Sequence, residues 1–119
     1  MIALEAASIV AVELVDHLTV PALRVALGPA TQLLRAGPRL LLLVDCLAMT
    51  GYDADARAQF VSWNAAHRPR IERVAIVTDN RLWHMVISAM GLAARQEMRP
   101  FTSTGRARVW LEERVRLAS

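Results

Sequence analysis

Five consecutive large apolar residues, at positions 40–44, constrain the fold more than any other stretch of the sequence. A strand with one face in water alternates apolar and polar side chains, whereas a strand covered on both faces need not alternate. Gly37 and Pro38 precede the run and Asp45 follows it, which predicts a strand bounded at both ends. Residues 74–77 form a second apolar block of the same kind. The two blocks therefore predict neighbouring strands inside a sheet that is covered on both sides.

The remaining periodicity predicts an alternation of strands and helices. We expect strands over residues 1–5, 9–14, 40–44, 71–78 and 97–101, with a turn at residues 6–8 and loops at residues 16–19 and 47–52. We expect helices over residues 20–36, from Asp53 or Asp55 to 67, from Asp79 or Asn80 to 95, and from Ser103 or Thr104 to 117. Gly28-Pro29 should kink the first helix or divide it. The prediction is an α/β fold with a small mixed, largely parallel sheet, an N-terminal β-hairpin and four flanking helices.

Length and composition bound the kind of protein. A chain of 119 residues suits one domain, and we take residues 1–119 as a single unit. No apolar run approaches the ~20 residues of a membrane span, and the first residues lack the features of a signal peptide. Cys46, the single cysteine, has no partner for an intramolecular disulfide, which favours a cytoplasmic location. The net charge is +3 and acids lie among the arginines, so we expect no nucleic-acid partner.

Three segments carry a resemblance to a known family: Leu18-Thr19 at the predicted entry to the first helix, residues 71–79 followed by Trp83, and Arg99-Pro100-Phe101 followed by residues 107–111. Over about residues 10–113 the chain resembles the SpoIIAA-like family, small bacterial domains related to the STAS fold of anti-sigma-factor antagonists and to the lipid-carrying CRAL-TRIO fold. The resemblance implies an architecture more than an activity, because its members are mostly of unassigned function.

One departure from the related regulatory domains is informative. Regulatory STAS domains carry an Asp-Ser-Ser-Gly-like motif in which a serine is phosphorylated. The matching positions here read Asp53-Ala54-Asp55-Ala56, so neither offers a hydroxyl. Phosphorylation switching of that kind is therefore not expected at this position.

Candidate polar sites are few. Asp45 and Asp79 each close a predicted buried strand, and with Asp53 they form a set of strand-end carboxylates at the edge where parallel sheets bind ligands. If they gathered within ~10 Å, they would suit Mg²⁺ and support an enzyme. The alternative is that Asp53 and Asp79 cap helices and Asp45 satisfies loop amides. No metal-ligand or catalytic motif surrounds the acids, the histidines or Cys46, so we predict no metal, no cofactor and no enzymatic activity.

The helix predicted to end near residue 95 carries more apolar surface than one contact requires. We expect one stripe to meet the sheet, formed by Leu82, Val86, Ala89 and Ala93. A second stripe recurs at helical spacing and is formed by Trp83, Ile87, Met90 and Ala94. Its surplus surface either packs on a neighbouring helix, forms an interface with a partner, or lines an apolar cavity. The candidate surface for a partner or an apolar ligand comprises Phe60, Trp63, Trp83, Met85, Ile87 and Met90.

These patterns predict a non-enzymatic binding or regulatory module that acts through a protein partner or a second copy of the chain. The alternative is a carrier or sensor of a small apolar, lipid-like molecule held between the sheet and the third helix. That ligand would contact Phe60, Trp83, Met85 and Met90.

Overall fold

The computed structural model describes residues 8–37 and 39–118, which form a four-stranded sheet and its covering helices. The strands are β1 (Ser8–Leu18), β2 (Leu40–Tyr52), β3 (Ile71–Val77) and β4 (Met98–Phe101). They lie in the order β1-β2-β3-β4, and each described pairing is parallel. Val44 of β2 pairs with Ile76 of β3, which confirms that the two apolar blocks lie side by side.

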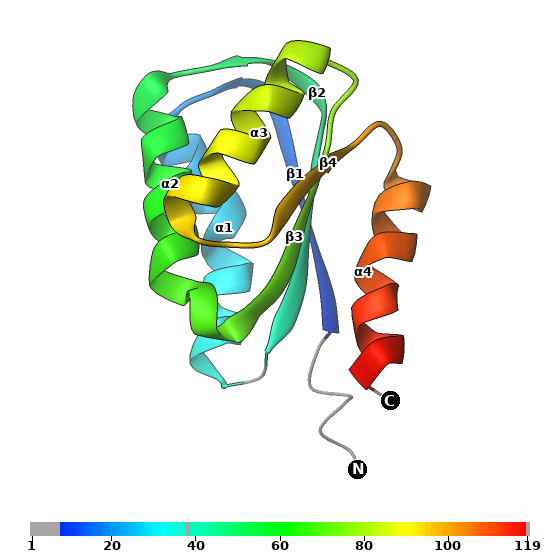
Figure 1. Cartoon of the computed structure of the whole chain (residues 1–119). Coiled ribbons are helices and arrows are strands. Elements are labelled where there is room, and N and C mark those ends of the chain that lie inside the picture. Colours follow the sequence, from blue (N-terminus) through cyan, green and yellow to red (C-terminus); the bar gives the residue numbers. More distant parts are fainter. Residues whose placement is uncertain (1–7, 38, 119) are drawn as a thin grey trace.

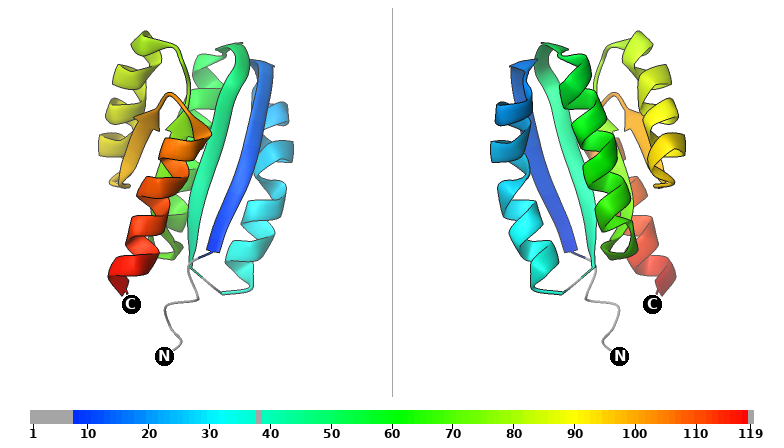
Figure 2. Two further views of the ribbon diagram at one scale, coloured as in Figure 1. Left: turned by 90° about the vertical axis from the view of Figure 1, so that its right-hand side faces the viewer. Right: turned by 90° about the vertical axis from the view of Figure 1, so that its left-hand side faces the viewer.

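The helices are α1 (Val20–Arg35), α2 (Ala54–His67), α3 (Arg81–Ala94) and α4 (Thr104–Ala118), with a 3₁₀ turn, η2 (Arg68–Arg70), before β3. Helices α1, α2 and α3 cover one face of the sheet, and α4 lies on the other face (Figures 1 and 2). None of the helices among the described residues is long and apolar enough to cross a lipid bilayer.

The interior strands are dry on both faces, as the unbroken apolar runs predict. In β2, Leu40, Leu42 and Val44 join the core under α1, α2 and α3. Leu41 and Leu43 point to the opposite face and pack in the core under α4. Successive side chains of a strand point to opposite faces, so two hydrophobic layers require apolar residues at every position.

The outer strands are longer than their sequence pattern predicts. Residues 16–18 belong to β1 and residues 47–52 belong to β2, so the predictions of loops at these residues were wrong. The two segments pair with each other beyond the end of β3, with register shifts between Glu13 and Val15 and between Asp16 and His17. Such shifts break the two-residue alternation on which strand prediction depends.

Two predictions at the N-terminal end have different outcomes. Ser8 was predicted to lie in a turn, but it is the first residue of β1. The first strand of the predicted hairpin, residues 1–5, lies outside the described residues. The hairpin therefore stays a prediction.

Helix α1 is continuous through Gly28 and Pro29, so of the two predicted outcomes, a kink or a division, the division is excluded. A residue with a Cβ atom before proline is disfavoured in the helical conformation, and Gly28 has no such atom. Pro29 cannot donate to the carbonyl of Val25, but both residues are exposed and water can replace the lost donor. Thr19 caps the start of the helix by accepting from the amide of Ala22.

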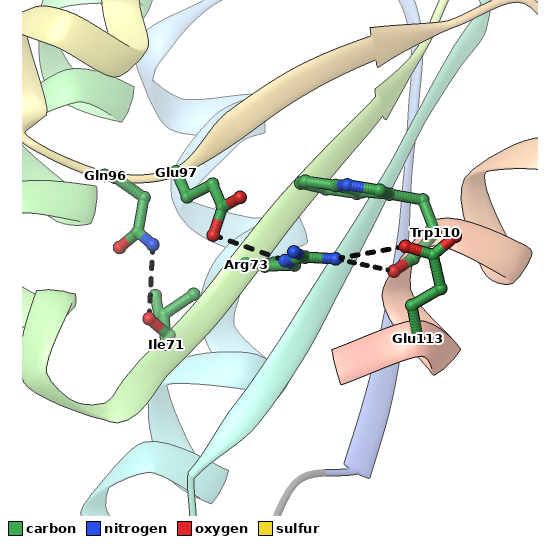
Figure 3. Close-up of polar contacts among 6 residues, drawn as sticks. All are labelled: Ile71, Arg73, Gln96, Glu97, Trp110 and Glu113. Atoms are coloured by element: carbon green, nitrogen blue, oxygen red, sulfur yellow. Dashed lines mark hydrogen bonds and ion pairs between the residues drawn. The ribbon is translucent and has the colours of Figure 1, made fainter. Parts of the chain in front are cut away.

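Hydrogen bonds and a cation–π contact join the helices to the sheet and to each other. Trp63 of α2 donates through Nε1 to the Thr31 hydroxyl of α1 at 3.0 Å, and that hydroxyl donates to the Leu27 carbonyl at 2.8 Å. On the other face, the guanidinium of Arg73 donates to the Trp110 carbonyl and lies against its ring, joining β3 to α4 (Figure 3).

Candidate binding surface on helices α2 and α3

Helix α3 is capped at both ends. The side chain of Asn80 accepts from the amide of Leu82 at 3.0 Å, so Asn80, one of the two residues predicted to cap the helix, is the N-cap. Arg95 ends the helix in the left-handed conformation, with φ of 55°. The chain then turns directly into β4, and the amide of Gln96 donates to the Gly91 carbonyl. These caps set the position of the helix along the sheet.

The apolar stripe of α3 that packs on the sheet is the second predicted stripe, formed by Trp83, Ile87, Met90 and Ala94. Ile87 is 3% exposed and Ala94 is also buried, while Trp83 and Met90 are half-buried. The prediction that Leu82, Val86, Ala89 and Ala93 face the sheet was wrong, because only Val86 among them is even half-buried. Both stripes have helical spacing. The deciding factor is packing, because Gly91 lies so close to β4 that an added Cβ would be 3.1 Å from the Met98 Cβ.

The outward side of α3 is consequently apolar. Leu82 and Met85 are each 75% exposed and Leu92 is 82% exposed, with Ala89 exposed between them. We call these four residues the α3 outer stripe. Three large apolar side chains on one helix face, all in water, exceed the single exposed hydrophobic residues that most surfaces carry.

A groove of about 410 Å³ runs beside this stripe, between α3 and α2. Apolar atoms dominate its lining, and its one charged side chain among the described residues is Arg57 of α2. The groove is lined by Arg57, Val61, Met85, Val86, Ala89, Met90 and Ala93. Figure 2 shows α2 and α3 adjacent on this side of the molecule.

A separate small cavity lies beneath the helices, against the sheet. Its volume is about 60 Å³, it is lined by residues of β1, β2, β3, α2 and α3, and it shares Arg57, Val86 and Met90 with the groove. Four of the six residues predicted for the partner or ligand surface line it: Phe60, Trp83, Ile87 and Met90. Met85 points instead to the groove, and Trp63 bonds to Thr31 on the side of α2 that faces α1.

The sequence did not indicate two further residues that line this cavity, Tyr52 and Arg57. Tyr52 lies edge-on to Trp83, with 5.5 Å between ring centroids, and the guanidinium carbon of Arg57 lies 5.9 Å from the Tyr52 ring centroid. Tyr52 falls in the predicted loop that is the end of β2, so no strand periodicity marked its orientation. Arg57 had no signal that separates it from other surface arginines.

The thiol of Cys46 also lines this cavity, and it is unreactive. Burial, with a smaller contribution from the Asp45 carboxylate, raises the pKa of Cys46 to about 12. The thiol is therefore uncharged near neutral pH and a poor nucleophile.

The predicted strand-end carboxylates do not lie at equivalent strand ends. Asp45 is within β2 and accepts from the amide of Leu47, and Asp53 lies 2.7 Å from Nε2 of His17, with no capping bond to α2. Asp79 is exposed before α3. No group of three or more acids, histidines or cysteines suited to a metal occurs in residues 8–37 and 39–118. A sheet whose strands lie in chain order has no point at which the order reverses, and it is there that ligand crevices form.

The described architecture is that of a STAS-type α/β domain, in which strands and helices alternate and α4 closes the second face. The chain belongs to the SpoIIAA-like family, whose sequence model matches residues 9–112. A solved structure of an uncharacterized protein with a SpoIIAA-like fold, from Shewanella loihica PV-4, is similar to it with a TM-score of 0.69. The two share 22% sequence identity over 85% of this chain and 82% of that chain, which establishes likeness of fold. Among curated proteins, none matches this chain.

Proposed function

We propose that this SpoIIAA-like domain is a non-enzymatic binding module that recognises a protein through α2 and α3. The observation that supports it is the α3 outer stripe, where Leu82, Met85 and Leu92 are at least 75% exposed beside an apolar groove. Contiguous apolar surface on this scale is typical of an interaction site.

Site-specific photocrosslinking in the source cell tests this proposal. A photoreactive residue replaces Met85, and the matched control carries it at Val25 of α1, which is 78% exposed but is not part of the groove lining. We expect a discrete crosslinked protein, or a crosslinked second copy, from position 85 alone. Crosslinks that are equal at both positions, or none at position 85, would contradict the proposal.

A second candidate function is supported by the cavity lined by Phe60, Trp83, Ile87 and Met90: a sensor or carrier of a small apolar ligand. Its size argues for the first function. An apolar cavity of about 150 Å³ holds benzene, and ligand pockets usually occupy about 300–1,000 Å³. A cavity of about 60 Å³ accommodates a lipid tail only if α3 moves away from the sheet.

Native mass spectrometry of freshly purified protein separates the two candidates. The binding-module proposal expects protein without bound lipid, and no rise in melting temperature on adding fatty acids. Co-purified lipid, or a concentration-dependent rise in melting temperature, would favour the carrier.

A further inference from the structure

We infer that the α2–α3 groove binds an amphipathic helix of another protein, with an apolar ridge bordered by carboxylates. This inference depends on the proposed function and specifies the chemistry of the partner. It follows from the shape of the surface and from the charges around it. A second copy of the chain would bring like charges against each other at the same surface.

The shape favours a helix. Helices α2 and α3 lie adjacent, and side chains between two packed helices leave a groove that a ridge of a third helix fills. The groove has an apolar floor that includes Val86 and Met90, and Met85 and Ala89 of the outer stripe form its outer wall. Helix α3 has 14 residues, so the surface is about 21 Å long and matches three to four turns of a partner helix.

The charged side chains that border the groove and the outer stripe are mainly cationic. Arg57 lines the groove from α2, while Arg81 at the start of α3 and Arg95 at its end lie outside the groove lining. One exposed acid, Asp79, precedes Arg81. None of the three arginines forms an ion pair with a residue that the structure describes. Carboxylates on both edges of a bound helix would pair with these cations, while its apolar ridge covers Met85 and Leu92.

The same charges disfavour a second copy as the occupant. A two-fold interface places the same patch of each copy against the other. An antiparallel pairing of two α3 helices would bring Arg81 of each copy toward Arg95 of the other, and Asp79, beside Arg81, offsets only part of that repulsion. A lipid surface is also anionic, but it is flat and leaves the groove unfilled.

Three synthetic peptides test the inference directly. Each is a helix of about 18 residues with the same leucine ridge, and the residues bordering the ridge are all glutamate, all glutamine or all arginine. We expect the glutamate peptide to bind about tenfold or more tightly than the arginine peptide at low salt, with the glutamine peptide between them. The preference should shrink as salt is added.

Variants locate the site. Met85→Glu should abolish binding of the glutamate peptide, and the matched control Val25→Glu should leave it unchanged. Arg57→Gln and Arg81→Gln should each reduce the preference for glutamate over arginine about threefold. Chemical shifts that change on titration should lie on α2 and α3.

Three results would overturn the inference, and the first two of them would leave the proposed function intact. Equal affinity for the glutamate and arginine peptides, or no peptide binding, would reject an acidic helix. Sedimentation equilibrium that shows a dimer dissociated by Met85→Glu would establish a second copy as the occupant. Binding to phosphatidylglycerol vesicles that Met85→Glu abolishes, without peptide binding, would establish a lipid surface. A Met85-specific protein crosslink would persist in the first two cases.

Discussion

The guanidinium carbon of Arg73 lies 4.4 Å from the centroid of the Trp110 ring, and Nη1 of the same side chain donates to the Trp110 carbonyl at 2.9 Å. Nε of Arg73 also donates to Glu97 at 3.2 Å, so one side chain joins β3, the residue before β4, and α4 (Figure 3). Helix α4 is the cover of its face of the sheet, so this contact holds the second hydrophobic layer in place.

Arg73→Ala should destabilise the protein by about 2–4 kcal/mol, because a charged hydrogen bond and a cation–π contact disappear together at a side chain that is 12% exposed. Urea unfolding followed by circular dichroism measures the change. Arg99→Ala is the control: its guanidinium carbon lies 4.9 Å from the same ring, but Arg99 is exposed. We expect it to lose less than about 1 kcal/mol. A loss for Arg73→Ala as small as that expected for Arg99→Ala would show that Arg73 does not hold α4 in place.

Thr31→Val should destabilise the contact between α1 and α2. Valine matches the shape of threonine but removes the oxygen that accepts from Trp63 Nε1 at 3.0 Å, leaving a half-buried donor without a partner. We expect a loss of about 1–2 kcal/mol in the free energy of unfolding. Thr31→Ser keeps the hydroxyl and should lose less. If the serine variant is as unstable as the valine variant, packing of the methyl group matters and the hydrogen bond does not.

Paired alanine substitutions test the orientation of α3. Ile87→Ala removes a side chain that is 3% exposed against the sheet and should cost about 2–4 kcal/mol of stability. Leu82→Ala removes a side chain that is 75% exposed and should change stability by less than about 0.5 kcal/mol. Thermal and urea unfolding give both values. The reverse order of effects would mean that the helix is rotated to place Leu82 on the sheet.

The thiol of Cys46 should make stability fall at alkaline pH. The folded-state pKa is raised to about 12 from an ordinary value of 9.0, so the unfolded chain releases this proton first. The contribution is complete below about pH 9 and is lost as pH rises toward 12, by about 1.4 kcal/mol per pH unit. Between pH 8 and pH 10, the wild-type protein should lose about 1.4 kcal/mol more than Cys46→Ala.

Urea unfolding at the two pH values measures this difference, and Cys46→Ala removes the titrating group while Tyr52 and the arginines remain. The same burial should make alkylation of the native thiol slow, and urea should accelerate it. An equal fall in stability in both proteins would show that the thiol titrates alike in the folded and unfolded states.

The strand and helix boundaries near the centre of the chain follow from local sequence. Residues 40–44 and 74–77 are apolar at every position, and only a strand buried on both faces requires such a pattern. Asn80 preceding an apolar helix was readable as an N-cap, since its side chain accepts a backbone amide. The likeness to SpoIIAA-like proteins depended on residues 71–79, which contain the second of these blocks, and on two further segments, at residues 18–19 and 99–111.

The candidate site was only partly predictable. Phe60, Trp83, Ile87 and Met90 do come together, because each lies on a face of α2 or α3 that packs toward the sheet. The exposure of Leu82 and Leu92 was not predicted, and Asp45 was placed at a strand end that lies seven residues farther along, at Tyr52. The register shifts that lengthen β2 depend on its pairing with β1, which no local pattern encodes.

The sequence by itself determined the order of the strands and helices from residue 9 onward, the interior position of residues 40–44 and 74–77, and the family to which the chain belongs. Tertiary structure alone decided the rotation of α3 and hence which apolar stripe remains in water. Helical spacing identifies residues that share a face, but a helix that is apolar on two faces satisfies that rule in two orientations. The choice between them depends on the close approach of Gly91 to β4, a contact between segments that meet only in the folded chain.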